Sequence, residues 1–124
     1  MTVSVLIPSY NAAGTIGRVL EALASQTVPP DEVILADSST DETRRIVRSS
    51  RPDVKIIELP ERSTPAVARN RAAAAAASET LVFLDSDAYP AADWLERLLE
   101  ARRDGCRAGG GSIVLPDFQR AHPL

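Results

Sequence analysis

Two aspartates one residue apart could hold a divalent cation. Asp85 and Asp87 directly follow the apolar run Leu81 to Leu84. In an extended segment such side chains lean to the same side, roughly 6.5 to 7 Å apart along the chain. Their charges repel each other, and Mg²⁺ or Mn²⁺, which commonly binds one or two carboxylates together with substrate phosphates, would relieve the repulsion. Taken alone, however, the pair is more typical of turn chemistry ahead of a helix than of a metal site, so its interpretation depends on its neighbours.

Other polar side chains follow the apolar runs of the chain in the same way. They are Ser9, Tyr10 and Asn11 after the first run, Asp37, Ser38 and Ser39 after the second, Glu61 and Arg62 after the third, and Arg69 and Asn70 early in the next helical stretch. A ring could stack on a base, a carboxylate could accept hydrogen bonds from a base or ribose, and an arginine could bind a diphosphate. The conjunction predicts a nucleotide site, because independent turn residues have no reason to collect at successive run ends.

These side chains must be positioned by alternating strands and helices. Strands are predicted at 3–8, 32–36, 54–59 and 81–84, with a fifth at 112–115, and helices at 16–23, after residue 39, at 66–77 and at 92–103. Strands that are apolar on both faces and alternate with helices indicate a mostly parallel sheet in a three-layer α/β/α sandwich, in which the run 81–84 is an inner strand. Ligands bind beyond the carboxyl ends of such strands, so the predicted site residues should share one edge.

Two helix starts are predicted from local signals. Ser39 and Glu42 form a Ser-x-x-Glu capping box, which predicts Ser39 as the N-cap of the second helix. Thr64 followed by Pro65 predicts the N-cap and first turn of the third. The six alanines at 72–77 indicate that this third helix is closely packed.

The composition is that of one soluble globular domain, with 124 residues, 44% of them hydrophobic and 25% charged. A net charge of −3 gives no general attraction to nucleic acid or to an anionic membrane, so no nucleic-acid partner is expected. Cys106 is the only cysteine, which excludes an internal disulfide. The chain shows neither an apolar run of about 18 residues nor a basic leader, and we therefore expect a cytoplasmic protein.

Six stretches of the chain occur in an order and spacing that is highly specific. They are VSVLIPSYN (3–11), SQT (25–27), DEVILADSSTDET (31–43), PAVARNRAAAAA (65–76), FLDSDAYP (83–90) and WLERLL (94–99). From about Val3 to Pro116, the chain resembles the N-terminal half of family 2 glycosyltransferases with the GT-A fold. The resemblance implies a Rossmann-like domain over 1–116 that binds a nucleotide-diphospho-sugar, and a tail at 117–124 where the acceptor half would begin. It further implies inverting transfer of the sugar to an acceptor that the sequence does not identify.

For the nucleotide, the resemblance assigns three residues. Pro8 and Tyr10 match positions that frame the base or stack on it. Asp37 matches an acidic position that contacts the base, often uracil, which favours a UDP-sugar over a GDP-sugar. The family often reads D-D-G-S-T-D in this segment whereas 36–41 reads A-D-S-S-T-D here, so Asp37 can align with either of the family's two carboxylates.

For the diphosphate and the cation, the resemblance assigns four more residues. Arg69 matches the arginine of an Ala-Arg-Asn segment near the diphosphate. Asp85 and Asp87 match the D-x-D pair that binds Mn²⁺ or Mg²⁺, with Asp85 and Ser86 also near the nucleotide-sugar. The cation would offset charge that develops on the departing nucleotide diphosphate.

No residue of the chain matches the family's general base, which deprotonates the acceptor hydroxyl and lies beyond the position matching Leu124. We therefore expect this chain to supply the donor and cation site, with little or no transfer of its own.

Two other functions stay open at this stage. A D-x-D after a strand also occurs in phosphatases of the haloacid dehalogenase type, although Tyr89 stands where they usually have threonine or valine. The other alternative is a nucleotide-binding or assembly module without transferase activity. In that case the apolar residues Ile113 to Leu115 and Phe118 would be covered by a second copy, giving a homo-oligomer, or by another partner.

Overall fold

The computed structural model describes residues 2–105 and 107–110. Strands and helices alternate in the order β1 (Val3–Ser9), α1 (Ile16–Ala24), β2 (Glu32–Asp37), α2 (Thr43–Ser50), β3 (Lys55–Glu58), α3 (Pro65–Ala75), β4 (Thr80–Phe83) and α4 (Trp94–Arg103). The expected fifth strand at 112–115, the tail at 117–124, Cys106 and the apolar residues Ile113 to Leu115 and Phe118 lie outside the described residues.

The four described strands form one parallel sheet in the order β3-β2-β1-β4. In its register Ser9 lies opposite Asp37, and Leu6 lies opposite Phe83. All the strands therefore run toward the same edge, and the loops that leave β1, β2 and β4 start side by side there.

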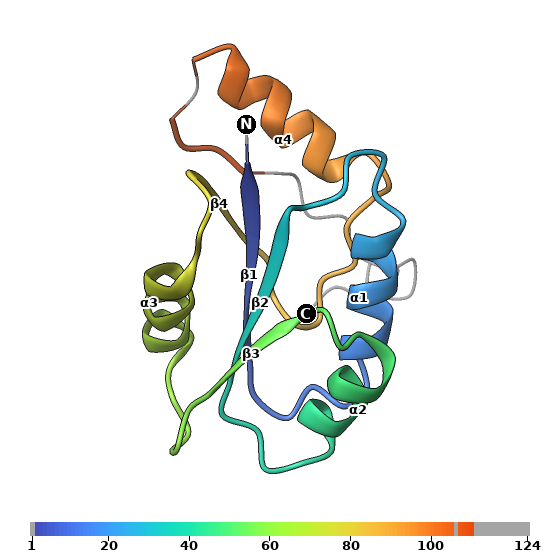
Figure 1. The fold of residues 1–124 in the computed structure, drawn as a ribbon, viewed down its shortest axis with the longest axis vertical. Coiled ribbons are helices and arrows are strands. Elements are labelled where there is room, and N and C mark those ends of the chain that lie inside the picture. The colour runs from blue at the N-terminus through green and yellow to red at the C-terminus, as the bar shows by residue number, and fades with distance from the viewer. Residues whose placement is uncertain (1, 106, 111–124) are drawn as a thin grey trace, which may run out of the picture.

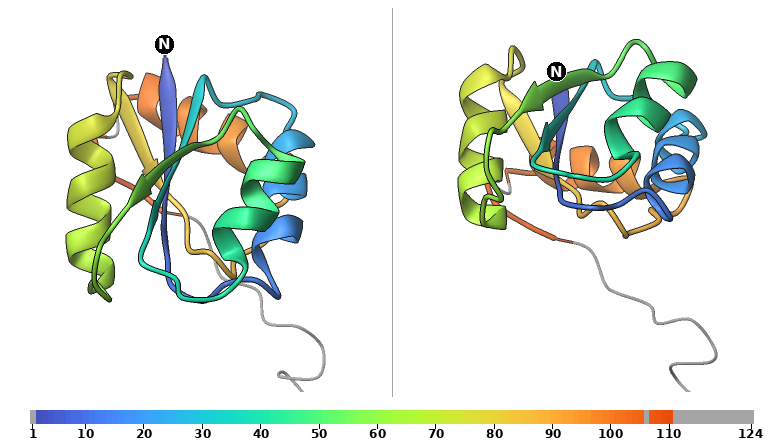
Figure 2. Two further views of the ribbon diagram at one scale, coloured as in Figure 1. Left: turned by 60° about the horizontal axis from the view of Figure 1, so that its bottom comes forward. Right: turned by 90° about the horizontal axis from the view of Figure 1, so that it is seen from below.

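Helices cover both faces of the sheet, with α1 and α2 on one side and α3 on the other (Figure 1). Side chains alternate along β1, so that Val5 and Ile7 join the core beneath α1 and α2 while Leu6 packs on the α3 side. Helix α4 packs through Leu95 and Leu99 against Val3, near the start of β1. Figure 2 shows the same layers from two further directions. The prediction of a three-layer α/β/α sandwich is confirmed.

Helix α3 confirms the predicted cap and the predicted close packing. The Thr64 hydroxyl accepts a hydrogen bond from the amide of Val67 at 3.3 Å, and Pro65 occupies the first turn. Ala68 and Ala72 are buried against Leu6 and its neighbours, because a methyl side chain lets the helix approach the sheet closely.

The predicted capping box at Ser39 is wrong. Helix α2 begins at Thr43, and the Ser39 hydroxyl instead donates to the carboxylate of Asp37 and accepts from the amide of Asn11 at 2.8 Å. The buried carboxylate of Asp37 needs hydrogen-bond donors, and this explains why the Ser39 hydroxyl binds it and does not cap the helix.

Strand β4 lies at an edge of the described sheet, not inside it as expected. Val82 and Leu84 face the core that contains α1, whereas Leu81 and Phe83 on the opposite face are 38% and 48% exposed. Only one face of β4 is therefore covered within the described residues. In the same part of the chain, none of the helices has the length and apolar character needed to cross a bilayer.

Candidate nucleotide and metal site

A pocket of about 750 Å³ opens at the edge of the sheet where β1 and β4 end. Its lining includes six of the residues predicted for the site, which are Pro8, Tyr10, Arg69, Asp85, Ser86 and Asp87. The volume lies within the usual range for small-molecule sites. Parallel strands thus bring together side chains that lie up to 79 positions apart in the sequence.

Tyr10 and Arg62 form a wall that this pocket shares with a second one. The guanidinium carbon of Arg62 lies 4.3 Å from the centroid of the Tyr10 ring, which is the geometry of a cation–π contact. The second pocket, of about 380 Å³, is lined by both residues and by Ser38, Ser39, Thr40, Arg44, Glu58, Leu59 and Pro60. The ring predicted to stack on a base is therefore covered by an arginine.

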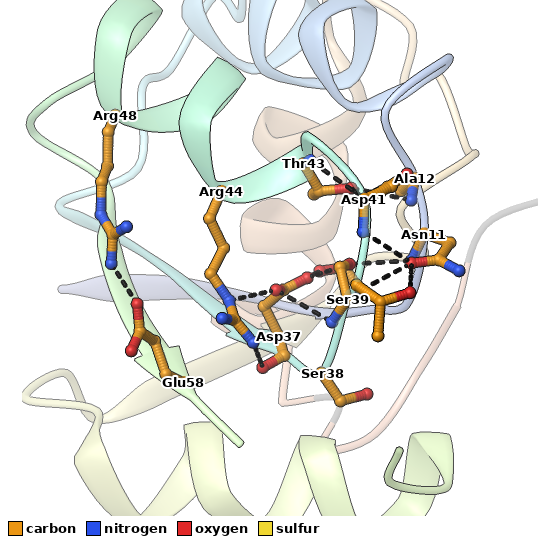
Figure 3. Close-up of polar contacts among 12 residues, drawn as sticks. Asn11, Ala12, Asp37, Ser38, Ser39, Asp41, Thr43, Arg44, Arg48 and Glu58 are labelled. Atoms are coloured by element: carbon orange, nitrogen blue, oxygen red, sulfur yellow. Dashed lines mark hydrogen bonds and ion pairs between the residues drawn. The ribbon is translucent and has the colours of Figure 1, made fainter. Parts of the chain in front are cut away.

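Asp37, the seventh predicted residue, is completely buried and lines neither of these two pockets. One carboxylate oxygen accepts from the hydroxyls of Ser9 and Ser39, and the other accepts from Nε of Arg44 at 2.7 Å and from the amide of Ser39 at 3.1 Å (Figure 3). Arg44 also reaches the Asp37 carbonyl oxygen at 3.4 Å. In this conformation the carboxylate organises the ends of β1 and β2.

A second set of hydrogen bonds joins the loop after β1 to the loop after β2. Asn11 has a left-handed backbone with φ of 48°, which asparagine tolerates better than most residues. Its side-chain oxygen accepts from the amides of Thr40 at 2.8 Å and Asp41 at 3.3 Å (Figure 3). The Asp41 carboxylate in turn accepts from the amides of Ala13 and Thr43. These hydrogen bonds therefore hold the two loops together as one unit beside the pocket.

The charge state of Asp41 reflects these contacts. Burial opposes ionisation, but the hydrogen bonds from Thr43 and from the amide of Ala13 outweigh it and hold the pKa of Asp41 below its ordinary value. Asp41 therefore keeps its negative charge, and with it the cross-link, over the neutral pH range.

The predicted cation ligands stand at the mouth of the larger pocket. Asp85 is 61% exposed at its side chain, and its carboxylate forms an ion pair with Arg69 at 3.0 Å. Asp87 lines the same pocket. In residues 2–105 and 107–110, no group of three or more carboxylate, histidine or cysteine side chains is arranged so that it could hold a metal ion by itself. Two exposed carboxylates fit Mg²⁺ or Mn²⁺ if phosphate and water oxygens complete the ligand set.

Several residues that shape the site were not assigned a role from the sequence. Asn11 and Arg62 were visible at strand ends, and an asparagine directly after a strand is a signal for a left-handed turn. Arg44 gave no such signal, because it lies on a helix seven positions after the carboxylate that it binds.

The fold and the site together define a structural class, the α/β domains whose pocket opens where parallel strands end. Within that class, the family described as Glycosyl transferase family 2 matches residues 4–116, and the chain belongs to this family. This confirms the resemblance found in the sequence, and it sets aside the phosphatase alternative.

Two relatives show how far the similarity extends. The chain is 39% identical over 102 residues to the putative teichuronic acid biosynthesis glycosyltransferase TuaG of Bacillus subtilis, a match covering 79% of this chain and 40% of TuaG. It is 36% identical over 118 residues to the succinoglycan biosynthesis protein ExoO of Rhizobium meliloti, covering 94% of this chain and 33% of ExoO. The chain thus spans between a third and two fifths of the length of these relatives.

Solved structures show the same fold. The S. aureus TarS 1–349 structure in complex with UDP has a TM-score of 0.76 and 34% identity, over 84% of this chain and 32% of that one. The mannosyltransferase PcManGT of Pyrobaculum calidifontis, in complex with GDP-Man and Mn²⁺, has a TM-score of 0.72 and 37% identity, over 79% of this chain and 31% of that one. These similarities confirm the GT-A fold prediction.

Proposed function

We propose that this chain supplies the donor site of an inverting glycosyltransferase, binding a nucleotide-diphospho-sugar together with a divalent cation. The observation that carries the proposal is that one pocket is lined by a ring, an arginine and two exposed carboxylates. Membership of Glycosyl transferase family 2 supports it, as do similar structures that hold UDP, UDP-GlcNAc or GDP-Man. The donor-binding unit would correspond to residues 1–116.

The base would stack on Tyr10, beside Pro8. Because the Arg62 guanidinium now covers the ring, donor binding must displace it or place the base on the other side. Asp37 is assigned to the base, and its family position favours uracil, hence a UDP-sugar. Since Ser9, Ser39 and Arg44 already occupy its oxygens, contact with a base requires one of these donors to move.

The diphosphate would bind at Arg69, and Asp85 and Asp87 would hold Mn²⁺ or Mg²⁺, with Ser86 beside the donor. A bound cation supplies Lewis-acid stabilisation of the charge on the departing diphosphate. Arg69 and Asp85 pair with each other in the free site, so each must exchange its partner for a charged group of opposite sign. The pocket therefore keeps its charges matched before and after the donor binds.

The acceptor and the general base are not assigned to residues of this chain. Asp85 and Asp87 are assigned to the cation and the donor, and Asp37 is buried beneath its hydrogen-bond partners, so none of the three is free to take a proton from an acceptor. We expect donor binding by this chain in isolation and little transfer. A cytoplasmic location, expected because the sequence has no apolar run of about 18 residues, is part of the same proposal.

Titration of UDP and GDP into the chain, followed by calorimetry, tests the donor assignment. Tyr10→Ala and Arg69→Gln should each weaken UDP binding about tenfold, since base stacking and a charge-assisted hydrogen bond each contribute about 1 to 3 kcal/mol. Glu100→Gln, an exposed change on α4, is the control and should bind as the wild type does. UDP affinity that is unchanged in both site variants would refute the proposal.

An assembly module without transferase activity is the second candidate. The exposed Leu81 and Phe83 on β4 favour it, since apolar edge residues are suited to contact a second copy. Sedimentation of the chain distinguishes the two candidates: a homo-oligomer that binds no nucleotide supports the module, and a monomer at high concentration contradicts it.

A further inference from the structure

We infer that Thr15 and Gln26 are positioning residues for the Asp85–Asp87 segment, holding it in place from helix α1 and the turn that follows it. This inference rests on the proposed cation site. Neither residue lies among the assigned ligands, and both act on the backbone of the segment that carries the ligands.

The segment between β4 and α4 needs such support. After the amide of Leu84 donates to the carbonyl of Leu6 at 3.0 Å, the described residues 85–93 form neither strand nor helix. One turn bond, from the amide of Ala88 to the carbonyl of Asp85 at 3.2 Å, lies within them. The direction of the two carboxylates is therefore set by contacts with other elements.

Thr15 makes the first of these contacts. Its hydroxyl donates to the carbonyl oxygen of Ser86 at 2.8 Å, between the two aspartates. Thr15 occupies the N-cap position of α1, where a threonine normally accepts a hydrogen bond from a helix amide. Among the described residues its side chain makes no such cap bond. The hydroxyl therefore does not cap α1, and its 2.8 Å hydrogen bond holds a loop 71 positions away.

Gln26 makes the second contact, five residues further along the segment. It is only 7% exposed, and its amide nitrogen donates to the carbonyls of Ala91 at 2.7 Å and Ala22 at 3.1 Å. Its oxygen accepts from the amide of Leu95 at 3.0 Å, one of the unpaired donors in the first turn of α4. A buried amide with both ends satisfied in this way fixes the loop and the helix start together.

A third contact lies between these two. The guanidinium carbon of Arg18, on α1, sits 4.3 Å from the centroid of the Tyr89 ring. Helix α1 and the residues after it thus run alongside the whole segment, and the ligand pair is bracketed at Ser86 and Ala91. Supporting residues of this kind commonly change metal affinity 10- to 100-fold when they are removed.

The test uses Thr15→Val, which keeps the shape and removes the donor, and Thr15→Ser, which restores it. Thr27→Val is a matched control, because the exposed Thr27 side chain makes no hydrogen bond within the described residues. Trp94, the only tryptophan, begins α4 and reports on the segment, so quenching of its fluorescence by Mn²⁺ measures cation binding. Thr15→Val should need about tenfold more Mn²⁺ for half-maximal quenching. Thr15→Ser and Thr27→Val should match the wild type. Because Thr15 also lines the donor pocket, metal-free UDP affinity should fall in Thr15→Val, but by less than Mn²⁺ affinity does.

Amide hydrogen exchange separates this inference from the proposed function. Exchange of the Ala88 amide, which is hydrogen-bonded to the carbonyl of Asp85, should accelerate in Thr15→Val and in Gln26→Glu, which loses the amide donor, and not in Thr15→Ser, whether or not Mn²⁺ binds. If the wild type shows no Mn²⁺ response, the cation site is refuted, and the exchange data still decide whether α1 holds the segment. Unchanged exchange in both variants, or an equal loss of metal-free UDP binding, would overturn the inference.

Discussion

The guanidinium of Arg69 lies 3.0 Å from the carboxylate of Asp85 across the mouth of the larger pocket. An arginine also contacts two other residues assigned to the donor: Arg44 forms an ion pair with Asp37, and Arg62 lies over the ring of Tyr10. Three side chains expected to contact a donor thus each hold an arginine in the free protein. A bound donor would have to replace each arginine as the partner of that side chain. Substitution of each arginine should therefore change ligand affinity or stability in a direction that can be predicted.

The Arg69–Asp85 pair should link cation binding to diphosphate binding. Arg69→Gln frees Asp85, so Mn²⁺ alone should bind up to about fivefold more tightly, since an exposed pair contributes at most about 1 kcal/mol. UDP should bind about tenfold more weakly because a charge-assisted hydrogen bond is lost. Calorimetric titrations of each ligand measure the two effects. Arg71→Gln, an exposed change on the same helix, is the control, and equal weakening of both ligands would argue against the linkage.

The Arg62–Tyr10 contact should oppose stacking of a base. An exposed cation–π contact contributes about 0.5 to 1 kcal/mol, so Arg62→Gln should bind uridine roughly two- to fivefold more tightly than the wild type. Uridine is the suitable probe because it has no phosphate for the guanidinium to bind. Titration followed by Tyr fluorescence or calorimetry gives the affinity. Weaker uridine binding by Arg62→Gln would mean that the arginine supports the base and does not cover its site.

The Arg44–Asp37 pair should matter for stability. Asp37 is fully buried, so Arg44→Gln would leave its charge without a counterion and should lower the free energy of unfolding by about 2 to 3 kcal/mol. Arg48→Gln breaks a pair with Glu58 that is largely exposed and screened by solvent, so it should lower the free energy of unfolding by clearly less than Arg44→Gln does. Urea unfolding measures both. Similar losses in the two variants would show that burial of Asp37 is not what makes its pair important.

The hydrogen bonds of Asp41 should make stability depend on pH. Because these bonds lower the pKa of Asp41, the stabilisation is present above its unfolded value of about 3.9 and is lost as pH falls through the folded value. Because Asp41 is exposed and solvent screens its charge, Asp41→Asn should reduce the free energy of unfolding by less than about 1 kcal/mol at pH 7, and the difference from the wild type should shrink below about pH 4. Unfolding measured from pH 7 to pH 3 checks this. A difference that stays constant down to pH 3 would exclude the ionised carboxylate as its cause.

The sequence predicted correctly those features that follow from the general geometry of parallel sheets and helices. Apolar runs that alternate with helical stretches predict a parallel sheet, and the carboxyl ends of its strands must share an edge. This is why Tyr10, Arg69 and Asp85, far apart in the sequence, could be expected in one pocket. The Thr64 cap was predictable for a similar reason, because all of its partners lie within one helical turn.

Sequence reasoning failed where distant partners compete for a side chain. Ser39 fits a capping box locally, but the buried Asp37 and the amide of Asn11 take its hydroxyl. Thr15, which was assigned no role from the sequence, is the N-cap residue of α1, and its hydroxyl binds the carbonyl of Ser86. Neither choice can be read from neighbouring residues, since each depends on how closely two loops approach once the sheet has formed.

Calorimetric titration of UDP with and without Mn²⁺, on the wild type and on Asp87→Ala, tests the central claim most directly. We predict that Mn²⁺ strengthens UDP binding by the wild-type chain at least about tenfold, and that Asp87→Ala removes most of this gain while binding UDP alone as before. UDP binding that is indifferent both to Mn²⁺ and to the loss of Asp87 would contradict the account.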